Sequence, residues 1–155
     1  MSHRIWIYTL SKALNSGQRE TLENTCGDFV SNWTAHEQRL EASFELYKER
    51  LLIFKVDEQA YNASGCSIDK LTRLVKELEK NYNVELLNRL LVVYEEGDDL
   101  KVALASEIKD LLKDGAINEN TIVYDNAIAS SSQWNAWKKP LKDTWLNKYL
   151  PSFSS

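Results

Sequence analysis

The chain has 155 residues, of which 43% are hydrophobic and 27% charged, and its formal net charge is −4 at pH 7. This composition is typical of one globular core, so we expect a single α+β domain over residues 1–155. Acidic and basic residues are interleaved, which argues against nucleic acid or anionic lipid as a partner. No apolar stretch is long enough for a signal peptide or a membrane span, so we expect no membrane association.

The cysteine and histidine spacing predicts neither a disulfide nor a metal site. Cys26 and Cys66 stand far apart without a Cys-x-x-Cys pattern. Free thiols of this kind are typical of a reducing compartment, which predicts a cytoplasmic protein. His3 and His36 are the only histidines, and neither has another ligand type at metal-binding spacing. We therefore expect no metal and no cofactor.

The first part of the chain alternates strands and helices. Ser16 and Ser67 are the expected helix caps, and Trp33-Thr34-Ala35-His36 is expected to end the first helix. In chain order we predict a strand, a helix, two paired strands and a helix, over residues 5–10, 17–33, 40–47, 51–56 and 68–78.

The remaining elements are shorter. The acidic turn Glu95-Glu96-Gly97-Asp98-Asp99 predicts a hairpin, and Gly115 is expected to close a helix. We expect the final helix to begin at Pro140, with Leu141, Trp145 and Tyr149 on one side. In chain order we predict two strands, a helix, a strand and that last helix, over residues 90–94, 100–104, 106–114, 121–124 and from 140 onward.

The order of these elements predicts the fold class. It is β-α-β-β-α-β-β-α-β-α, and its first six members match the split β-α-β order of the ferredoxin-like fold. We therefore expect an antiparallel sheet with helices packed mainly on one face, followed by a C-terminal β-α extension.

Cys66 is the candidate nucleophile. It follows Gly65 where a helix begins, and unpaired N–H groups at a helix start lower the pKa of a thiol. With His36 as base and the N–H of Ser67 as oxyanion donor, it would serve a cysteine-dependent acyl-transfer or hydrolytic enzyme. The simpler interpretation is a small buried side chain.

The same helix start is also a candidate anion site. Backbone N–H groups and the Ser67 hydroxyl would contact a small anionic ligand, with Lys70 one turn along. Alternatively, Ser67 only caps the helix. The candidate ligand-binding residues are Gly65, Cys66, Ser67, Asp69, Lys70, Trp33 and His36.

Three of the five tryptophans lie near the C-terminus, at Trp134, Trp137 and Trp145. Lysines are interleaved with them, as in proteins that stack single-stranded nucleic acid. Because the chain is acidic, core packing or a docking surface for a protein partner is the better interpretation.

Several segments together resemble a family of small bacterial proteins. The resemblance covers nearly the whole chain, and its most distinctive part is Gly65-Cys66-Ser67-Ile68-Asp69. The other segments are Trp6-Ile7-Tyr8, Trp33-Thr34-Ala35-His36, Thr121-Ile122-Val123-Tyr124 and Pro140-Leu141-Lys142-Asp143-Thr144-Trp145. Members of this family often bear the label ABC transporter ATPase. The chain has no Gly-x-x-x-x-Gly-Lys-Ser/Thr loop to hold phosphates, so we predict no ATPase activity.

Three hypotheses on function follow. The preferred one is a non-catalytic cytoplasmic domain that binds a small anionic ligand or a protein partner, using the Gly65 to Lys70 helix start with Trp33 and His36. The second is the thiol enzyme with Cys66 and His36. The third is a structural interaction protein that docks through its tryptophan-rich tail. The oligomeric state is open.

Overall fold

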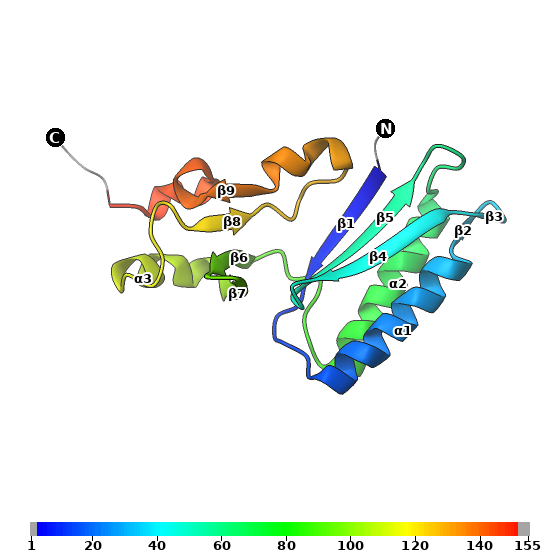
Figure 1. Cartoon of the computed structure of the whole chain (residues 1–155), viewed down its shortest axis with the longest axis horizontal. Coiled ribbons are helices and arrows are strands. Elements are labelled where there is room, and N and C mark those ends of the chain that lie inside the picture. The colour runs from blue at the N-terminus through cyan, green and yellow to red at the C-terminus, as the bar shows by residue number, and fades with distance from the viewer. Residues whose placement is uncertain (1–2, 152–155) are drawn as a thin grey trace. The chain divides into compact units, whose positions relative to one another are not determined.

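The computed structural model describes residues 3–151, which form two compact units (Figure 1). The first unit comprises residues 3–88 and 126–134, and the second comprises residues 89–125 and 135–151. Each unit contains an antiparallel sheet and at least one helix, which confirms the α+β class. The expectation of a single domain stays a prediction.

The first unit is built on a three-stranded sheet with β5 at its centre. The strand order is β1-β5-β4, and both pairings are antiparallel. The bounds are His3–Thr9 for β1, Glu41–Tyr47 for β4 and Leu51–Asp57 for β5. The predicted hairpin of β4 and β5 is confirmed. The first four residues of β5 are at most 1% exposed, and Leu52 and Phe54 belong to the core of this unit.

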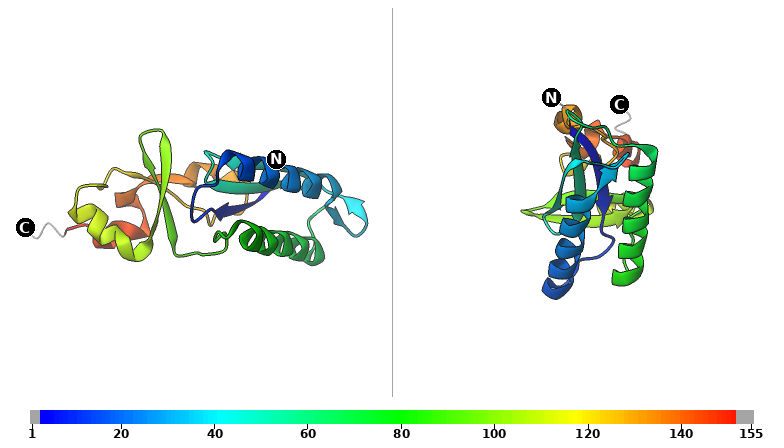
Figure 2. Two further views of the ribbon diagram at one scale, coloured as in Figure 1. Left: turned by 90° about the horizontal axis from the view of Figure 1, so that it is seen from below. Right: turned by 90° about the vertical axis from the view of Figure 1, so that its right-hand side faces the viewer.

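Two helices, α1 (Ser16–Asn32) and α2 (Gly65–Tyr82), cover one face of this sheet (Figures 1 and 2). Side chains from both helices meet those of β5 in one core, as the helical spacing of apolar residues predicted. The fully buried members of this core from α1, β5 and α2 are Leu22, Cys26, Leu52, Phe54, Val56, Leu71, Val75 and Leu78.

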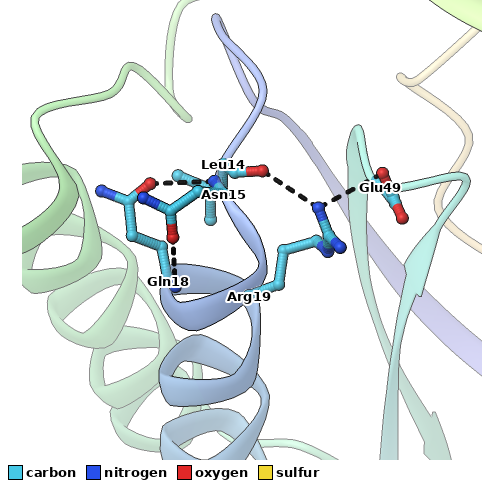
Figure 3. A network of polar contacts seen from close by, with 5 residues as sticks. All are labelled: Leu14, Asn15, Gln18, Arg19 and Glu49. Atoms are coloured by element: carbon cyan, nitrogen blue, oxygen red, sulfur yellow. Dashed lines mark hydrogen bonds and ion pairs between the residues drawn. The ribbon is translucent and has the colours of Figure 1, made fainter.

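Asn15, and not the predicted Ser16, caps α1 (Figure 3). The Asn15 Oδ1 accepts a hydrogen bond from the Gln18 N–H at 2.8 Å, and the Gln18 Oε1 accepts one from the Asn15 N–H at 3.0 Å. A cap at Ser16 would place Arg19 at the third helical position, where its guanidinium offers no acceptor for the return bond. Arg19 instead donates to the Leu14 carbonyl at 3.1 Å.

The segment after α1 is a small hairpin, so the prediction that His36 ends the helix is wrong. Its strands are β2 (Thr34–Ala35) and β3 (Gln38–Arg39). Trp33 is already extended, and both it and Ala35 are buried, so alternation along a strand replaces the helical pattern here. His36 and Glu37 form the turn with φ of 50° and 65°, a conformation usually taken by Asn-Gly.

The strand that follows α2 in the chain belongs to the second unit and not to the sheet of β1. The edge of β1 that does not pair with β5 contacts residues 126–134, which belong to the same unit. Arg4 and Ser130 form a single antiparallel bridge, and the Ile5 N–H donates to the Ala129 carbonyl at 2.9 Å. Asn126 Nδ2 donates to Thr9 Oγ1 at 3.0 Å, at the other end of the strand.

The second unit has a four-stranded sheet of order β7-β6-β8-β9, with every pairing antiparallel. The bounds are Leu91–Glu96 for β6, Asp99–Leu104 for β7, Ile122–Tyr124 for β8 and Lys138–Pro140 for β9. The 3-10 turn η1 (Ala105–Glu107) leads into α3 (Ile108–Lys113). The turn η2 (Ser131–Ala136), which begins in the first unit, precedes β9. The predicted hairpin is confirmed, with Gly97 at φ 62°, and so is the end of the third helix before Gly115 at φ 78°.

The predicted last helix is wrong: β9 ends at Pro140, and two 3-10 turns follow, η3 (Leu141–Asp143) and η4 (Trp145–Tyr149). Thr144 separates them in an extended conformation. Its Oγ1 donates to the Leu141 carbonyl at 2.7 Å and accepts from the Leu146 N–H at 3.2 Å, so it takes backbone groups that a helix would need. Within residues 3–151, no helix is long and apolar enough to cross a membrane.

Candidate functional site

The start of α2 is fixed by a reciprocal pair of serines. Ser64 is the N-cap, and Ser67, the predicted cap, is the third residue of the helix. The Ser67 hydroxyl accepts from the Ser64 N–H at 2.7 Å and donates to the Ser64 carbonyl at 2.7 Å, and Ser67 is 0% exposed. Its only hydroxyl proton is thereby used, so this group has none to donate to a ligand.

Trp33 lies beneath this helix start. Its indole Nε1 donates to the Ser67 carbonyl at 2.8 Å, and the side chain is 1% exposed. The ring packs against Phe29 and Trp6, with centroids 5.0 and 5.6 Å away. Trp33 therefore holds the β2 segment against α2 with its one polar atom already paired.

The other predicted site residues, Gly65, Cys66, Asp69, Lys70 and His36, are exposed. The Lys70 ammonium lies 3.4 Å from Thr34 Oγ1, so β2 and the first turns of α2 are neighbours. Among the described residues, the N–H groups of Gly65 and Cys66 donate to no protein acceptor, and no hydrogen bond joins the Cys66 thiol to His36. This helix start offers two N–H donors and a thiol to solvent.

The second cysteine, Cys26, is buried, whereas Cys66 is exposed. It is 0% exposed in the core of the first unit. Burial raises the pKa of its thiol to about 12, and the nearby Glu23 carboxylate acts in the same direction. Cys26 is therefore a protonated core side chain at neutral pH.

No three His, Cys, Asp or Glu side chains come together within residues 3–151 in a way that could hold a metal ion. Several carboxylates follow one another in sequence at the turn of β6 and β7. One of them, Glu95, contacts side chains of β8 and β9. Tyr124 donates to the Glu95 Oε1 at 2.6 Å, and Lys138 lies 3.8 Å from the same oxygen.

Sequence reasoning missed this Tyr124–Glu95–Lys138 group because its members come from three strands. The Lys138 ammonium also lies over the rings of Tyr124 and Trp137, 5.3 and 5.7 Å from their centroids. Tyr124 and Trp137 stack at 4.9 Å. These contacts join β6, β8 and β9, so we interpret the group as structural.

The three C-terminal tryptophans have different surroundings. Trp137 is 8% exposed, Trp134 is partly buried beneath the Lys55 ammonium, and Trp145 is 58% exposed. Trp145 begins η4, between Thr144 and Leu146. The Lys148 ammonium lies over both the Trp145 and the Tyr149 rings, 5.2 and 5.1 Å from their centroids. We call Trp145, Lys148 and Tyr149 the η4 surface.

The η4 surface is held from below by fully buried side chains. Leu141 and Leu146 are both 0% exposed in the core of the second unit, which also contains Ile108 of α3. The sequence placed Trp145 on the buried side, one helical turn after Leu141. The signal against this was Thr144, whose hydroxyl favours a local turn over a continuing helix.

Comparison with known proteins adds no relative. No family model, no curated protein and no solved structure matches the chain.

Proposed function

We propose that this protein is a non-catalytic docking module that binds a protein partner through the η4 surface of its second unit. The observation that carries the proposal is the exposure of Trp145, at 58%. Tryptophan, with tyrosine and arginine, is enriched among the side chains that dominate binding energy at protein interfaces.

The local structure supports presentation of Trp145 in a fixed position. The hydroxyl of Thr144 joins the two turns on either side of it, and Leu146 anchors the next residue in the core. A side chain that is ordered before binding loses less conformational entropy on association, so more of its burial energy becomes affinity.

The charges around Trp145 indicate the chemistry of the partner. Residues 138–148 include four lysines and one aspartate, in a chain that is acidic overall. Lys142 and Lys148 are both exposed. An apolar segment that carries carboxylates fits this surface, because the carboxylates would face the lysines while an apolar side chain covers the Trp145 ring.

Binding of a small anion at the start of α2 has less support, because Trp33 and Ser67 are engaged within the protein. The thiol enzyme has one observation in its favour, the exposed Cys66 beside two unpaired N–H groups. A base in hydrogen-bond contact with the thiol is absent among the described residues, so we keep this function as the second candidate.

We further propose that the first unit is a ferredoxin-like core in which residues 126–134 occupy the position of the fourth strand. The order β1-β5-β4 and the bridge of Arg4 with Ser130 support this assignment. A cytoplasmic location and membership of the bacterial family that the sequence resembles are parts of the same proposal.

Selection from a phage-displayed library of random peptides on the full chain tests the partner chemistry. We expect enriched peptides to combine carboxylates with apolar side chains, and Lys148→Glu to weaken them about ten-fold. The matched control is Lys76→Glu, a charge reversal on the exposed face of α2, which should leave binding unchanged. Enrichment of basic peptides, no enrichment, or equal loss in both variants would contradict the proposal.

A further inference from the structure

Strand β7 lies at an edge of the second sheet. For each of its residues, the hydrogen-bonding pattern shows whether the N–H and C=O groups point towards β6 or away from it. The Ala105 N–H donates to the Leu90 carbonyl at 2.9 Å, next to the pair of Leu91 with Leu104. Hydrogen-bonded pairs recur at every second residue of an antiparallel ladder. Residues 99, 101 and 103 therefore bond to β6, and Leu100, Val102 and Leu104 direct their N–H and C=O groups outward.

Most of this outward edge is unpaired. The Leu104 N–H is taken by the Glu107 carboxylate at 2.8 Å. Within residues 3–151, the outward backbone groups of Leu100 and Val102 form no hydrogen bond. An edge of this kind is a template for another extended chain.

The opposite edge of the same sheet lacks this capacity. Strand β9 has three residues, Lys138, Lys139 and Pro140. Short length, lysine and proline are the features by which proteins protect sheet edges from further pairing. An added strand therefore has one suitable edge in this sheet.

The side chains of β7 specify what an added strand should carry. Asp99 and Lys101 lie on one face of the strand, both are exposed, and neither forms an ion pair among the described residues. Val102 and Leu104 lie on the other face, half-buried and 40% exposed. On an added strand, a negative side chain opposite Lys101 and a positive side chain opposite Asp99 would therefore be favourable.

We propose that β7 binds an extended segment of a partner protein by antiparallel strand addition, with a carboxylate opposite Lys101 and apolar side chains opposite Leu100, Val102 and Leu104. This site is separate from the η4 surface, and the two proposals can fail independently. A second copy of the chain is the competing occupant, because two-fold pairing about Val102 would set Lys101 opposite Ala103 of the other copy and bring no like charges together. The variants below decide between the two.

Two labelled peptides of identical composition test the proposal against the full chain by fluorescence anisotropy, at low concentration to keep the peptides monomeric. The peptide Val-Thr-Val-Glu-Val-Lys, read antiparallel from Leu104, places its glutamate opposite Lys101 and its lysine opposite Asp99. In Val-Thr-Val-Lys-Val-Glu the two charges are exchanged. We expect the first to bind at least about ten-fold more tightly than the second. Equal binding, or preference for the second, would overturn the proposal.

Val102→Pro is the decisive variant, with Val102→Thr as its control. The Val102 N–H points away from β6, so proline removes a bond to the peptide without removing one from the sheet. We expect about ten-fold weaker peptide binding for proline and none of that loss for threonine, with circular dichroism and the thermal midpoint reporting an intact sheet.

The same variants decide between the peptide and a second copy. If the proline variant binds the peptide as well as the threonine variant does, β7 is not the site. If sedimentation shows a wild-type dimer that Val102→Pro abolishes, the edge binds another copy and the proposal is wrong. Trp145→Ala should leave peptide binding at β7 unchanged, which separates this test from that of the η4 surface.

Discussion

Trp33 and Trp145 are used in opposite ways in the two units. Trp33 is 1% exposed, and its N–H is hydrogen-bonded to the Ser67 carbonyl. Trp145 is 58% exposed, although the residue after it is fully buried. The same residue type is a core component that fixes the start of α2 in one region and a solvent-facing ring in the other. Exposure and hydrogen bonding, and not the presence of tryptophan, therefore distinguish the structural Trp33 from Trp145, the candidate for docking.

The same contrast applies to the serines and threonine near each ring. Ser64 and Ser67 bond to each other and close the helix start. Thr144 bonds across two short turns and thereby holds Trp145 between two anchored leucines. The first arrangement removes polar groups from solvent, and the second presents a ring to it.

The largest expected effect is on stability at Trp33. Trp33→Ala should lower the free energy of unfolding by about 3–5 kcal/mol, because a fully buried aromatic side chain is lost and the Ser67 carbonyl loses its donor. Trp145→Ala should change it by less than about 0.5 kcal/mol. Urea unfolding followed by circular dichroism measures both. If both variants lost a comparable free energy of unfolding, Trp33 and Trp145 would not differ in their contribution to the fold.

The two thiols should differ in reactivity and in their effect on stability at high pH. A thiol reagent should modify Cys66 in the native protein and Cys26 only after unfolding. The Cys26 pKa is about 12 in the folded state against an ordinary value of 9.0, so the folded state holds its proton more tightly. The stabilisation that the protonated Cys26 thiol contributes to folding is fully present below pH 9 and is lost as the pH rises towards 12.

The expected slope of that loss is at most about 1.4 kcal/mol per pH unit. Cys26→Ala should be less stable at neutral pH but show a flatter decline above pH 9. Urea unfolding at several pH values gives this slope for each protein. Parallel declines in the two proteins would show that the Cys26 thiol is not responsible.

A smaller pair of effects distinguishes the two caps. Ser64→Ala should cost about 1 kcal/mol, because the Ser67 N–H loses its acceptor at the helix start, and it should leave peptide binding at the η4 surface unchanged. Thr144→Val should cost a similar amount and also weaken that binding, since Trp145 loses its fixed position. Thermal unfolding and peptide titration together test the pair. Equal binding by both variants would show that Thr144 does not orient the ring.

The smallest effect is expected at the hairpin next to α2. Glu37 has a φ of 65°, which costs a non-glycine residue backbone energy that glycine avoids. Glu37→Gly should therefore stabilise the protein by about 0.5 kcal/mol after the entropy gained by the unfolded chain is counted. Glu20→Gly, on the exposed face of α1, is the control and should destabilise it. Destabilisation by Glu37→Gly would mean that the glutamate side chain contributes at the turn.

Periodic segments were predictable from sequence, and segments governed by local hydrogen bonds were not. The apolar spacing of Leu71, Val75 and Leu78 placed α2, and the turn at Gly97 placed the hairpin of β6 and β7. Both caps were assigned to a serine that is not the N-cap, whereas Asn15 caps α1 and Ser64 caps α2, because a capping box depends on which neighbour can accept a bond. Thr144 interrupts the helix that Pro140 and the apolar spacing predicted.

The candidate sites depended on long-range contacts that spacing does not encode. The sequence grouped Trp33 and Ser67 as ligand contacts, and they do meet, but through a hydrogen bond that satisfies both. Which residues of β7 point their N–H and C=O groups away from β6 follows from the register of the two strands, and the sequence alone does not give that register. The pairing of a strand with a segment distant in sequence, such as Arg4 with Ser130, leaves no local signal at all.

The most direct test of the docking function is isothermal titration of the enriched acidic peptide against wild type, Trp145→Ala and Leu90→Ala. Leu90 is 67% exposed in the same unit, so its variant controls for loss of any exposed apolar side chain. We predict a loss of at least about ten-fold in affinity for Trp145→Ala and no change for Leu90→Ala. Unchanged affinity for Trp145→Ala would contradict the assignment of the η4 surface as the docking site.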